Sequence, residues 1–325
     1  MTANCDTVSF HCNACGKCCN SAPLMSLPEL FHHENLFVGC LSLRRVNRHK
    51  QGQQLIAANT HYALTSEDIQ QFTALRAQLF NANDGHAQTA CDYALMTQAI
   101  DYPSGNQCPA LGADNRCTIH DRHKPAMCGM VPFDALYPDP LQHIVLLNRR
   151  FDADCIVAGN HVEFPVVIKQ RQIVSDDFEN ALSKRREALR QDKQWWGDTV
   201  FSRLQRELLG NPAQDNRIPA NDELLSFSII PALQVLASIS ETTNTRCLQY
   251  VDSQLALIDT KIAQALARKS AGDKKTTRLF RSFRDAYLKF RPQLLANQHS
   301  PSPFSCPTET EDWLKTAADY LGIAD

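Results

Sequence analysis

Apolar residues recur every three or four positions over long stretches of the second half of the chain. That spacing is typical of amphipathic helices, and it predicts four long helices, over residues 175–209, 222–240, 245–270 and 274–297. Pro231 should kink or interrupt the second of these helices, because proline lacks the N–H of the helical ladder. A capping-box pattern at Thr308–Glu311 predicts a last, shorter helix. We therefore expect residues 170–325 to form an α-helical bundle domain.

The patterns in residues 1–165 are shorter and more varied. The elements they predict are helices after the caps Ser26 and Thr65, strands over 41–46 and 142–151, a hairpin from Cys108 to Cys117 and a helical turn over 121–127. This part should be a small, loop-rich cysteine-cluster domain that binds metal. With the helical bundle that follows it, the chain is predicted to be of the α+β class.

The composition of the chain says more about the cellular compartment of the protein than about its binding partners. The chain has 325 residues, 43% of them hydrophobic, and a formal net charge of -2, which is too small to indicate a partner by itself. No apolar run is long enough to span a bilayer, so we expect no membrane segment. The first residues lack the basic and apolar regions of a secretory signal, and 13 cysteines fit disulfide pairing poorly because the number is odd. We therefore expect a cytoplasmic protein.

Four thiols lie close together near the start of the chain, at Cys12, Cys15, Cys18 and Cys19. Steps of three residues, with Gly16 to allow a tight turn, let successive thiolates converge on one inorganic centre. In a reducing compartment such a cluster indicates metal ligands more than disulfides. Adjacent side chains diverge in an extended chain, so Cys18 and Cys19 are not expected to bind the same ion. Cys19 could instead be a buried packing residue.

A second group of cysteines follows at long range, in segments rich in turn residues. The candidate metal ligands from both groups are Cys12, Cys15, Cys18, Cys19, Cys108, Cys117, Cys128 and Cys155. Eight thiolates would suit two four-coordinate sites, or one cluster and a separate ion.

The spacing favours an iron–sulfur cluster, of the 4Fe-4S type, over zinc. Three-residue steps are the opening of a ferredoxin-type run, whereas the second group lacks the close cysteine pairs of a zinc knuckle. The usual ferredoxin continuation is absent, because Cys19 follows Cys18 directly. Zinc therefore stays the alternative metal.

A family resemblance is carried by the run Cys12-x2-Cys15-Gly16-x-Cys18-Cys19, followed by Cys108-Pro-x-Leu, Cys117-x-Ile and Lys124-Pro125 before Cys128. This combination resembles the YkgJ-family cysteine cluster proteins, which are described as carrying a zinc- or iron-chelating CxxCxxCC domain. The resemblance covers roughly residues 8–160 and implies metal binding there. His120 stands where the family usually has tyrosine and Lys124 where it has arginine, and neither change touches a thiol.

The same cysteine run resembles, more distantly, the flagellin lysine N-methylase, which holds a 4Fe-4S cluster and transfers a methyl group. No glycine-rich loop for S-adenosylmethionine is visible after a strand, so protein-lysine methylation is one alternative among several. No hydrolase triad, phosphate loop or HExxH motif is visible either. The sequence predicts a metal protein used for redox chemistry or protein modification, or a zinc-stapled module for protein interaction.

Two further features have plainer interpretations. His11, His120 and His123 adjoin cluster cysteines, but the thiols suffice in number, so surface or packing roles are favoured. Residues 268–291 interleave basic and aromatic side chains, a pattern that can bind an acidic protein or a nucleic acid. The helical period favours aromatics in a core and cations facing water. We expect a protein partner or substrate, and no nucleic acid.

Overall fold

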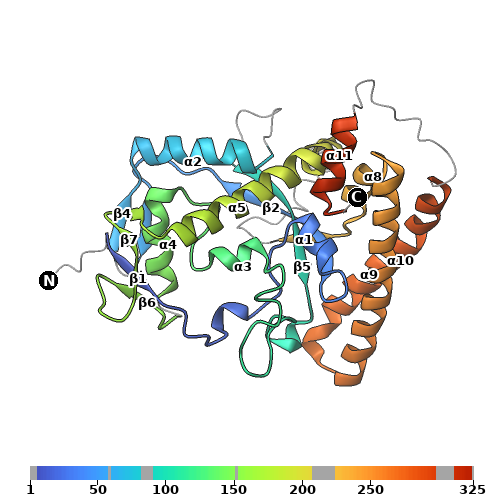
Figure 1. The fold of residues 1–325 in the computed structure, drawn as a ribbon, viewed down its shortest axis with the longest axis horizontal. Helices are drawn as coiled ribbons and strands as arrows, with labels where there is room; N and C mark the ends of the chain where they lie inside the picture. Colours follow the sequence, from blue (N-terminus) through green and yellow to red (C-terminus); the bar gives the residue numbers. More distant parts are fainter. Residues whose placement is uncertain are drawn as a thin grey trace. The chain divides into compact units, whose positions relative to one another are not determined.

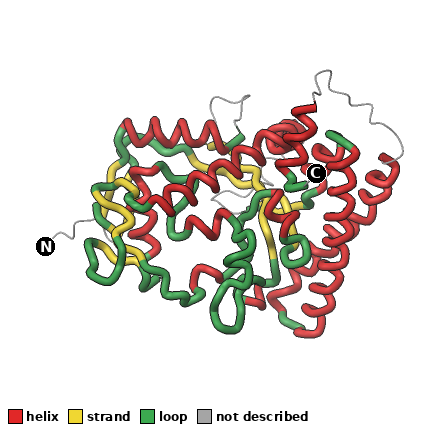
Figure 2. The backbone as a smooth tube through the Cα atoms, viewed as in Figure 1, coloured by secondary structure: helices red, strands yellow, loops and turns green. Residues whose placement is uncertain are grey.

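The structure is a computed structural model, which describes residues 6–57, 60–81, 91–150, 153–206, 224–297 and 311–323. It is 53% helical and 17% strand, so the predicted α+β class is confirmed (Figures 1 and 2). The chain divides into two compact units, each made of three segments. The first comprises Met1–Cys19, Val46–Tyr93 and Leu111–Arg190, and the second Asn20–Arg45, Ala94–Ala110 and Gln191–Asp325. The predicted domain division between residues 165 and 170 stays a prediction.

A four-stranded antiparallel sheet, of order β6-β1-β7-β8, is the framework of the first unit. Its strands are β1 (Val8–Phe10), β6 (Ile156–Ala158), β7 (Val166–Lys169) and β8 (Gln172–Ile173). Val8 pairs with Ala158 and Phe10 with Ile156. The strand nearest the N-terminus is therefore held inside the sheet, between two strands from much later in the sequence.

A β-hairpin and a capped helix follow β1 in the first unit. Strands β3 (Gln54–Ala57) and β4 (Thr60–Ala63) pair antiparallel, and α2 (Ser66–Leu79) comes next. The predicted cap at Thr65 is confirmed, because its hydroxyl accepts from the Asp68 N–H over 3.2 Å and its own N–H donates to the Asp68 carboxylate over 2.8 Å. This reciprocal pair satisfies donors that the first helical turn leaves open.

The strand predicted over residues 142–151 is wrong. These residues form α4 (Gln142–Arg149), in which Gln142 to Leu147 are all buried. The helix packs against β1, β3 and β6, so its apolar side chains are covered on several sides. A continuous apolar run of this kind has no period that distinguishes a buried helix from a buried strand.

Two short elements of the first unit differ from expectation. The helical turn expected over residues 121–127 begins later, as α3 (Ala126–Met130), because Pro125 fits immediately before a first turn and not inside one. The expected hairpin from Cys108 to Cys117 is reduced to one bridge, between Leu111 and Cys117.

The second unit combines a three-stranded sheet, of order β5-β2-β9, with helices. Its strands are β2 (Val38–Asn47), β5 (Cys91–Ile100) and β9 (Leu225–Phe227), of which β2 and β5 extend into the first unit. Its helices are α1 (Leu27–His32), α6 (Asp198–Leu204), α8 (Ile230–Ala237), α9 (Glu241–Arg268), α10 (Lys274–Asn297) and α11 (Glu311–Tyr320). Helix α5 (Asp176–Asp192), most of which belongs to the first unit, continues along the chain through a π-helical turn (Lys193–Gly197) into α6. None of the helices in the described ranges is long and apolar enough to cross a membrane.

The predicted long helices over residues 245–270 and 274–297 are confirmed as α9 and α10. The helix predicted over 222–240 is wrong in its first half, where residues 225–227 form β9. Pro231 lies in the first turn of α8, where its missing N–H costs nothing, so it begins a helix instead of kinking one. Most of the capping box predicted at Thr308–Glu311 lies outside the described residues.

Helices α9 and α10 lie side by side (Figure 1). The aromatic residues of α10 are buried, as the helical period predicts: Phe280, Phe283, Tyr287 and Phe290. Along one edge, Arg284 donates to Asp259 and Arg291 to Asp252, each over 2.6 Å. Helices α9 and α10 are therefore held together by buried aromatic side chains and by ion pairs along one edge.

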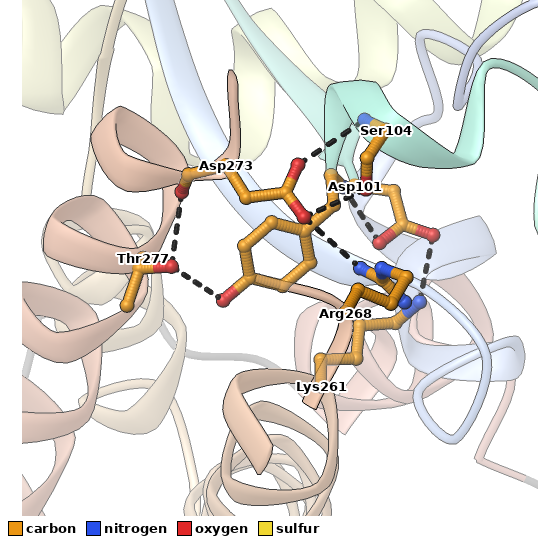
Figure 3. Close-up of polar contacts among 7 residues, drawn as sticks. Asp101, Ser104, Lys261, Arg268, Asp273 and Thr277 are labelled. Atoms are coloured by element: carbon orange, nitrogen blue, oxygen red, sulfur yellow. Dashed lines mark hydrogen bonds and ion pairs between the residues drawn. The ribbon is translucent and has the colours of Figure 1, made fainter. Parts of the chain in front are cut away.

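The loop after β5 is fixed to the junction of α9 and α10 (Figure 3). Ser104 donates from its N–H and its hydroxyl to the Asp273 carboxylate, over 3.2 and 2.6 Å. Arg268 donates to the same carboxylate over 3.4 Å, and Lys261 pairs with Asp101 over 2.7 Å. Bonds to charged groups are stronger than neutral ones, so this network holds the loop firmly.

The buried carboxylate of Asp192 joins three elements of the second unit. It accepts from the Leu27 N–H at the start of α1 over 3.2 Å, from the Thr97 hydroxyl on β5 over 3.0 Å, and from the Tyr320 hydroxyl on α11 over 2.6 Å. Asp192 is only 4% exposed, so these donors replace the water that its charge has lost.

Candidate metal centre

Strand pairing brings Cys155 next to the start of the cysteine loop, which we define as residues 11–19. Phe10 ends β1 and pairs with Ile156, which begins β6. The ladder continues by one bond, in which the His11 N–H donates to the Cys155 carbonyl over 3.0 Å. The sheet therefore fixes one distant cysteine at the base of the loop.

Backbone turns shape the cysteine loop. Ala14 and Gly16 have positive φ angles of 52° and 71°, which confirms the turn predicted at the glycine. The Asn13 side chain accepts from the Cys15 N–H over 3.3 Å, and the Cys19 N–H donates to the Gly16 carbonyl over 2.9 Å. In the loop, the half-buried thiol is Cys19 and the exposed thiols are Cys12, Cys15 and Cys18. The loop thus presents sulfur to solvent and does not build core.

Gly16 places the loop against the turn that carries another cysteine. A Cβ on Gly16 would lie 3.4 Å from Leu111 Cδ2 and 3.5 Å from Asn115 Oδ1. Leu111 bridges to Cys117, and Asn115 lies in the turn between them with φ 60°. Cys117 is half-buried. A second distant thiol is therefore held in a segment that touches the loop.

The thiols of the loop and Cys155 interact electrostatically. The pKa of Cys155 is raised, first by burial and then by negative charge on Cys15, Cys12 and Cys18. A bound metal cation would stabilise the thiolate form of such a group. Four cysteine thiolates are the donor set that zinc and iron–sulfur clusters take, so these residue types fit either group in their chemistry.

In the described part of the chain, no three His, Cys, Asp or Glu side chains lie close enough together to hold a metal ion as they stand. The eight-cysteine ligand set therefore stays a prediction. Five of its members lie in segments that touch one another in the first unit: Cys12, Cys15 and Cys18 in the loop, Cys155 immediately before β6, and Cys117 on the turn beside Gly16.

The remaining predicted ligands are placed as follows. Cys19 forms the end of the loop's 3-10 turn. Cys128 is half-buried on α3, and Ala126 and Gly129 of the same helix border a hollow of about 540 Å³ against α5. Cys108 is 8% exposed and belongs to the second unit, in the loop that Ser104 fixes to Asp273.

Two neighbours of the site carry no signal in the sequence. Lys17 Nζ lies 3.3 Å from the Asp154 carboxylate, which joins the loop to the residue before Cys155. Both side chains are exposed, so this pair orients the segments more than it stabilises them. The His11 ring packs 5.8 Å from the Phe164 ring, in agreement with a packing role.

These features define a thiol-rich domain suited to metal. Comparison with protein families agrees, because residues 11–150 match the CxxCxxCC family, described as "Putative zinc- or iron-chelating domain". Residues 11–150 are therefore similar to the CxxCxxCC domain, and the YkgJ-family label that the cysteine pattern suggested fits that domain. Cys155 lies just beyond the matched residues. No curated protein and no solved structure matches the chain, and the comparisons give no support to a link with the lysine methylase.

Proposed function

We propose that this is a cytoplasmic metalloprotein whose CxxCxxCC domain holds a 4Fe-4S cluster through Cys12, Cys15, Cys18 and Cys155. Three closely spaced cysteines and one distant one are a ligand pattern of such clusters. The observation that supports the proposal is the bond from the His11 N–H to the Cys155 carbonyl, because it holds the segment of a distant cysteine beside the short motif.

When bound, the cluster would supply one-electron redox chemistry, tuned by hydrogen bonds and exposure around its sulfurs. The chain's own residues would position and expose it. The exposed loop allows a protein partner to approach the site closely, and the Lys17–Asp154 pair would orient the two ligand segments. The role would be electron transfer, redox sensing or modification of a protein substrate.

A zinc-stapled interaction module is the second candidate. The observation that favours it is the lack of buried residues in the 3-10 turn of the loop, since a segment with little core gains most from a structural metal. Cys117 and Cys128, both half-buried, would supply further thiolates. In this case the metal would fold the domain and take no part in chemistry.

The two candidates differ in a direct measurement. The protein would be purified without oxygen, and its absorption spectrum recorded with its iron, sulfide and zinc contents. We expect broad absorbance near about 400 nm, typical of iron–sulfur centres, with matching iron and sulfide. Colourless protein with stoichiometric zinc would reject the cluster in favour of the module.

A matched pair of variants tests the ligands. Cys15→Ser should lose the metal, whereas Cys247→Ala, which removes a buried thiol on α9, should keep it. Unchanged metal content in Cys15→Ser would reject the site.

A further inference from the structure

One stripe of α10 faces solvent along its whole length. Its positions alternate in steps of four and three residues, which is heptad spacing and keeps side chains on one line of a helix. The stripe consists of Lys274, Arg278, Arg281, Asp285, Leu288, Pro292 and Leu295, all of them exposed. The aromatic residues of α10 are buried on its other side, so the stripe is free of the packing that holds the helix in place.

The first half of this stripe is a cluster of cations. Lys274, Arg278 and Arg281 are exposed, as is the flanking Lys275, and none of the four forms an ion pair within the described residues. The edge of α10 that faces α9 is different, because Arg284 and Arg291 there are neutralised by aspartates. The stripe itself holds one opposing carboxylate, Asp285, and so keeps a net positive charge.

The second half of the stripe is apolar. Leu288 is 46% exposed and Leu295 37%, and they lie seven residues apart. Leucines at this spacing are the knobs of helix-to-helix packing, and here no described element covers them. Charge at one end and leucines at the other give the stripe a direction.

We propose that this stripe of α10 is a docking surface for a helix of a protein partner. That helix would carry acidic side chains opposite Lys274, Arg278 and Arg281, and apolar side chains at heptad spacing opposite Leu288 and Leu295. Charge complementarity would set its register and speed its association, and the leucines would supply the buried area.

The same observations disfavour two other occupants. Single-stranded nucleic acid binds through exposed aromatic platforms, but the aromatics of α10 are in the core. An interfacial membrane helix inserts its apolar face into lipid, and that face of α10 is already packed against α9. Two exposed leucines fit a partner helix better than a bilayer.

The test is a binding measurement on the full-length protein, with or without metal. The probe is a fluorescent acidic helical peptide of roughly 20 residues, with glutamates in its first half and heptad-spaced leucines in its second. Arg278→Glu with Arg281→Glu should weaken binding at least about tenfold, the effect of losing about 1.4 kcal/mol of interaction. Arg278→Gln with Arg281→Gln should weaken binding less. This neutral variant shows whether reversing the charge acts by disturbing the fold.

Matched control variants distinguish an effect of this surface on peptide binding from a general effect of net charge or exposed hydrophobic residues. Arg203→Glu with Lys315→Glu changes the net charge equally, at exposed positions on α6 and α11, and should leave binding unchanged. Leu288→Ser should weaken binding several-fold, whereas Leu266→Ser, at a leucine of α9 that is 54% exposed, should not. Circular dichroism checks that each variant is folded.

Equal binding by the wild type and the α10 double variant would overturn the proposal. The proposal would also be overturned if the α10 surface bound a DNA duplex, a DNA single strand or phosphatidylserine vesicles more tightly than the peptide. Because the surface needs no metal, failure here would leave the proposed cluster standing, and loss of the cluster would leave this result unchanged.

Discussion

The His11 N–H donates to the Cys155 carbonyl over 3.0 Å, one step beyond the pairing of Phe10 with Ile156. This bond makes Cys155 a fixed neighbour of the cysteine loop. The short motif and its distant thiol thus belong to one piece of antiparallel sheet, and their separation in sequence hides that relationship.

Replacing Cys155 by serine should therefore lower metal content although the residue lies beyond the matched family domain. We expect metal occupancy to fall several-fold, because serine oxygen is a poor ligand for iron–sulfur clusters and zinc. Cys91→Ser, at a buried cysteine of β5, is the matched control. Equal metal content in the two variants would remove Cys155 from the site.

Gly16→Ala should destabilise the loop through both conformation and crowding. A positive φ of 71° costs a non-glycine residue about 1–2 kcal/mol, and the new methyl would meet Leu111 at 3.4 Å. Gly52→Ala separates the two causes, because Gly52 has φ 78° with nothing within 4 Å of its Cβ position. Urea unfolding should show losses in both variants, and metal binding should weaken only in Gly16→Ala. Weakened binding in both would mean that the loop is not selectively affected.

Tyr320→Phe should cost about 1.5–3 kcal/mol of unfolding free energy, because it removes a donor from the buried Asp192 carboxylate. Tyr102→Phe is the comparison. Among the described residues the Tyr102 hydroxyl accepts a bond from the neutral Thr277 hydroxyl over 3.3 Å, and its loss should cost about 0.5–1.5 kcal/mol. Chemical denaturation with the two variants in parallel measures the difference. Equal losses would show that the carboxylate does not depend on α11.

Acid should weaken the network in Figure 3. Burial alone would raise the pKa of Asp273, but hydrogen bonds from Ser104 and Arg268 outweigh it and lower that pKa. A carboxyl whose pKa is lower in the folded state stabilises fully above its unfolded value, about 3.9, and loses this contribution as pH falls through the folded value.

Urea unfolding at pH 7, 5 and 3 tests this sign with Asp273→Asn. The variant should be less stable than the wild type at pH 7 and should lose less stability between pH 5 and pH 3. Asp285→Asn, at the exposed carboxyl on α10, is the matched control for the loss of one negative charge. The same drop between pH 5 and pH 3 in Asp273→Asn as in the wild type would contradict the assignment.

Sequence was sufficient where a local chemical signal exists. Thr65 caps α2 through Asp68 three residues on, and the apolar period of α10 separates its buried aromatics from its cations. It failed over residues 142–149, because an apolar run buried on several sides has no diagnostic period. The start of α8 was also predicted wrongly, because a proline such as Pro231 is compatible either with a kink inside a helix or with the first turn of one.

Part of the candidate metal site could likewise be predicted from the sequence, and part could not. The three-residue steps from Cys12 to Cys18 mark thiolate chemistry in the sequence alone. The place of Cys155 depends on which strand pairs with β1, and pairing between distant strands leaves no trace in either segment. Lys17 and Asp154 become neighbours only through the same pairing.

The position of β1 inside its sheet also sets an order of events during synthesis. The cysteine loop leaves the ribosome long before β6 and β7, the two hydrogen-bonding neighbours of β1, which begin only at Ile156 and Val166. At about 5–20 residues per second, β1 waits on the order of ten seconds for partners. During that interval its thiols are attached to an unpaired strand and are open to oxidation. Metal insertion should thus be timed by the arrival of β6 and not by the appearance of the motif.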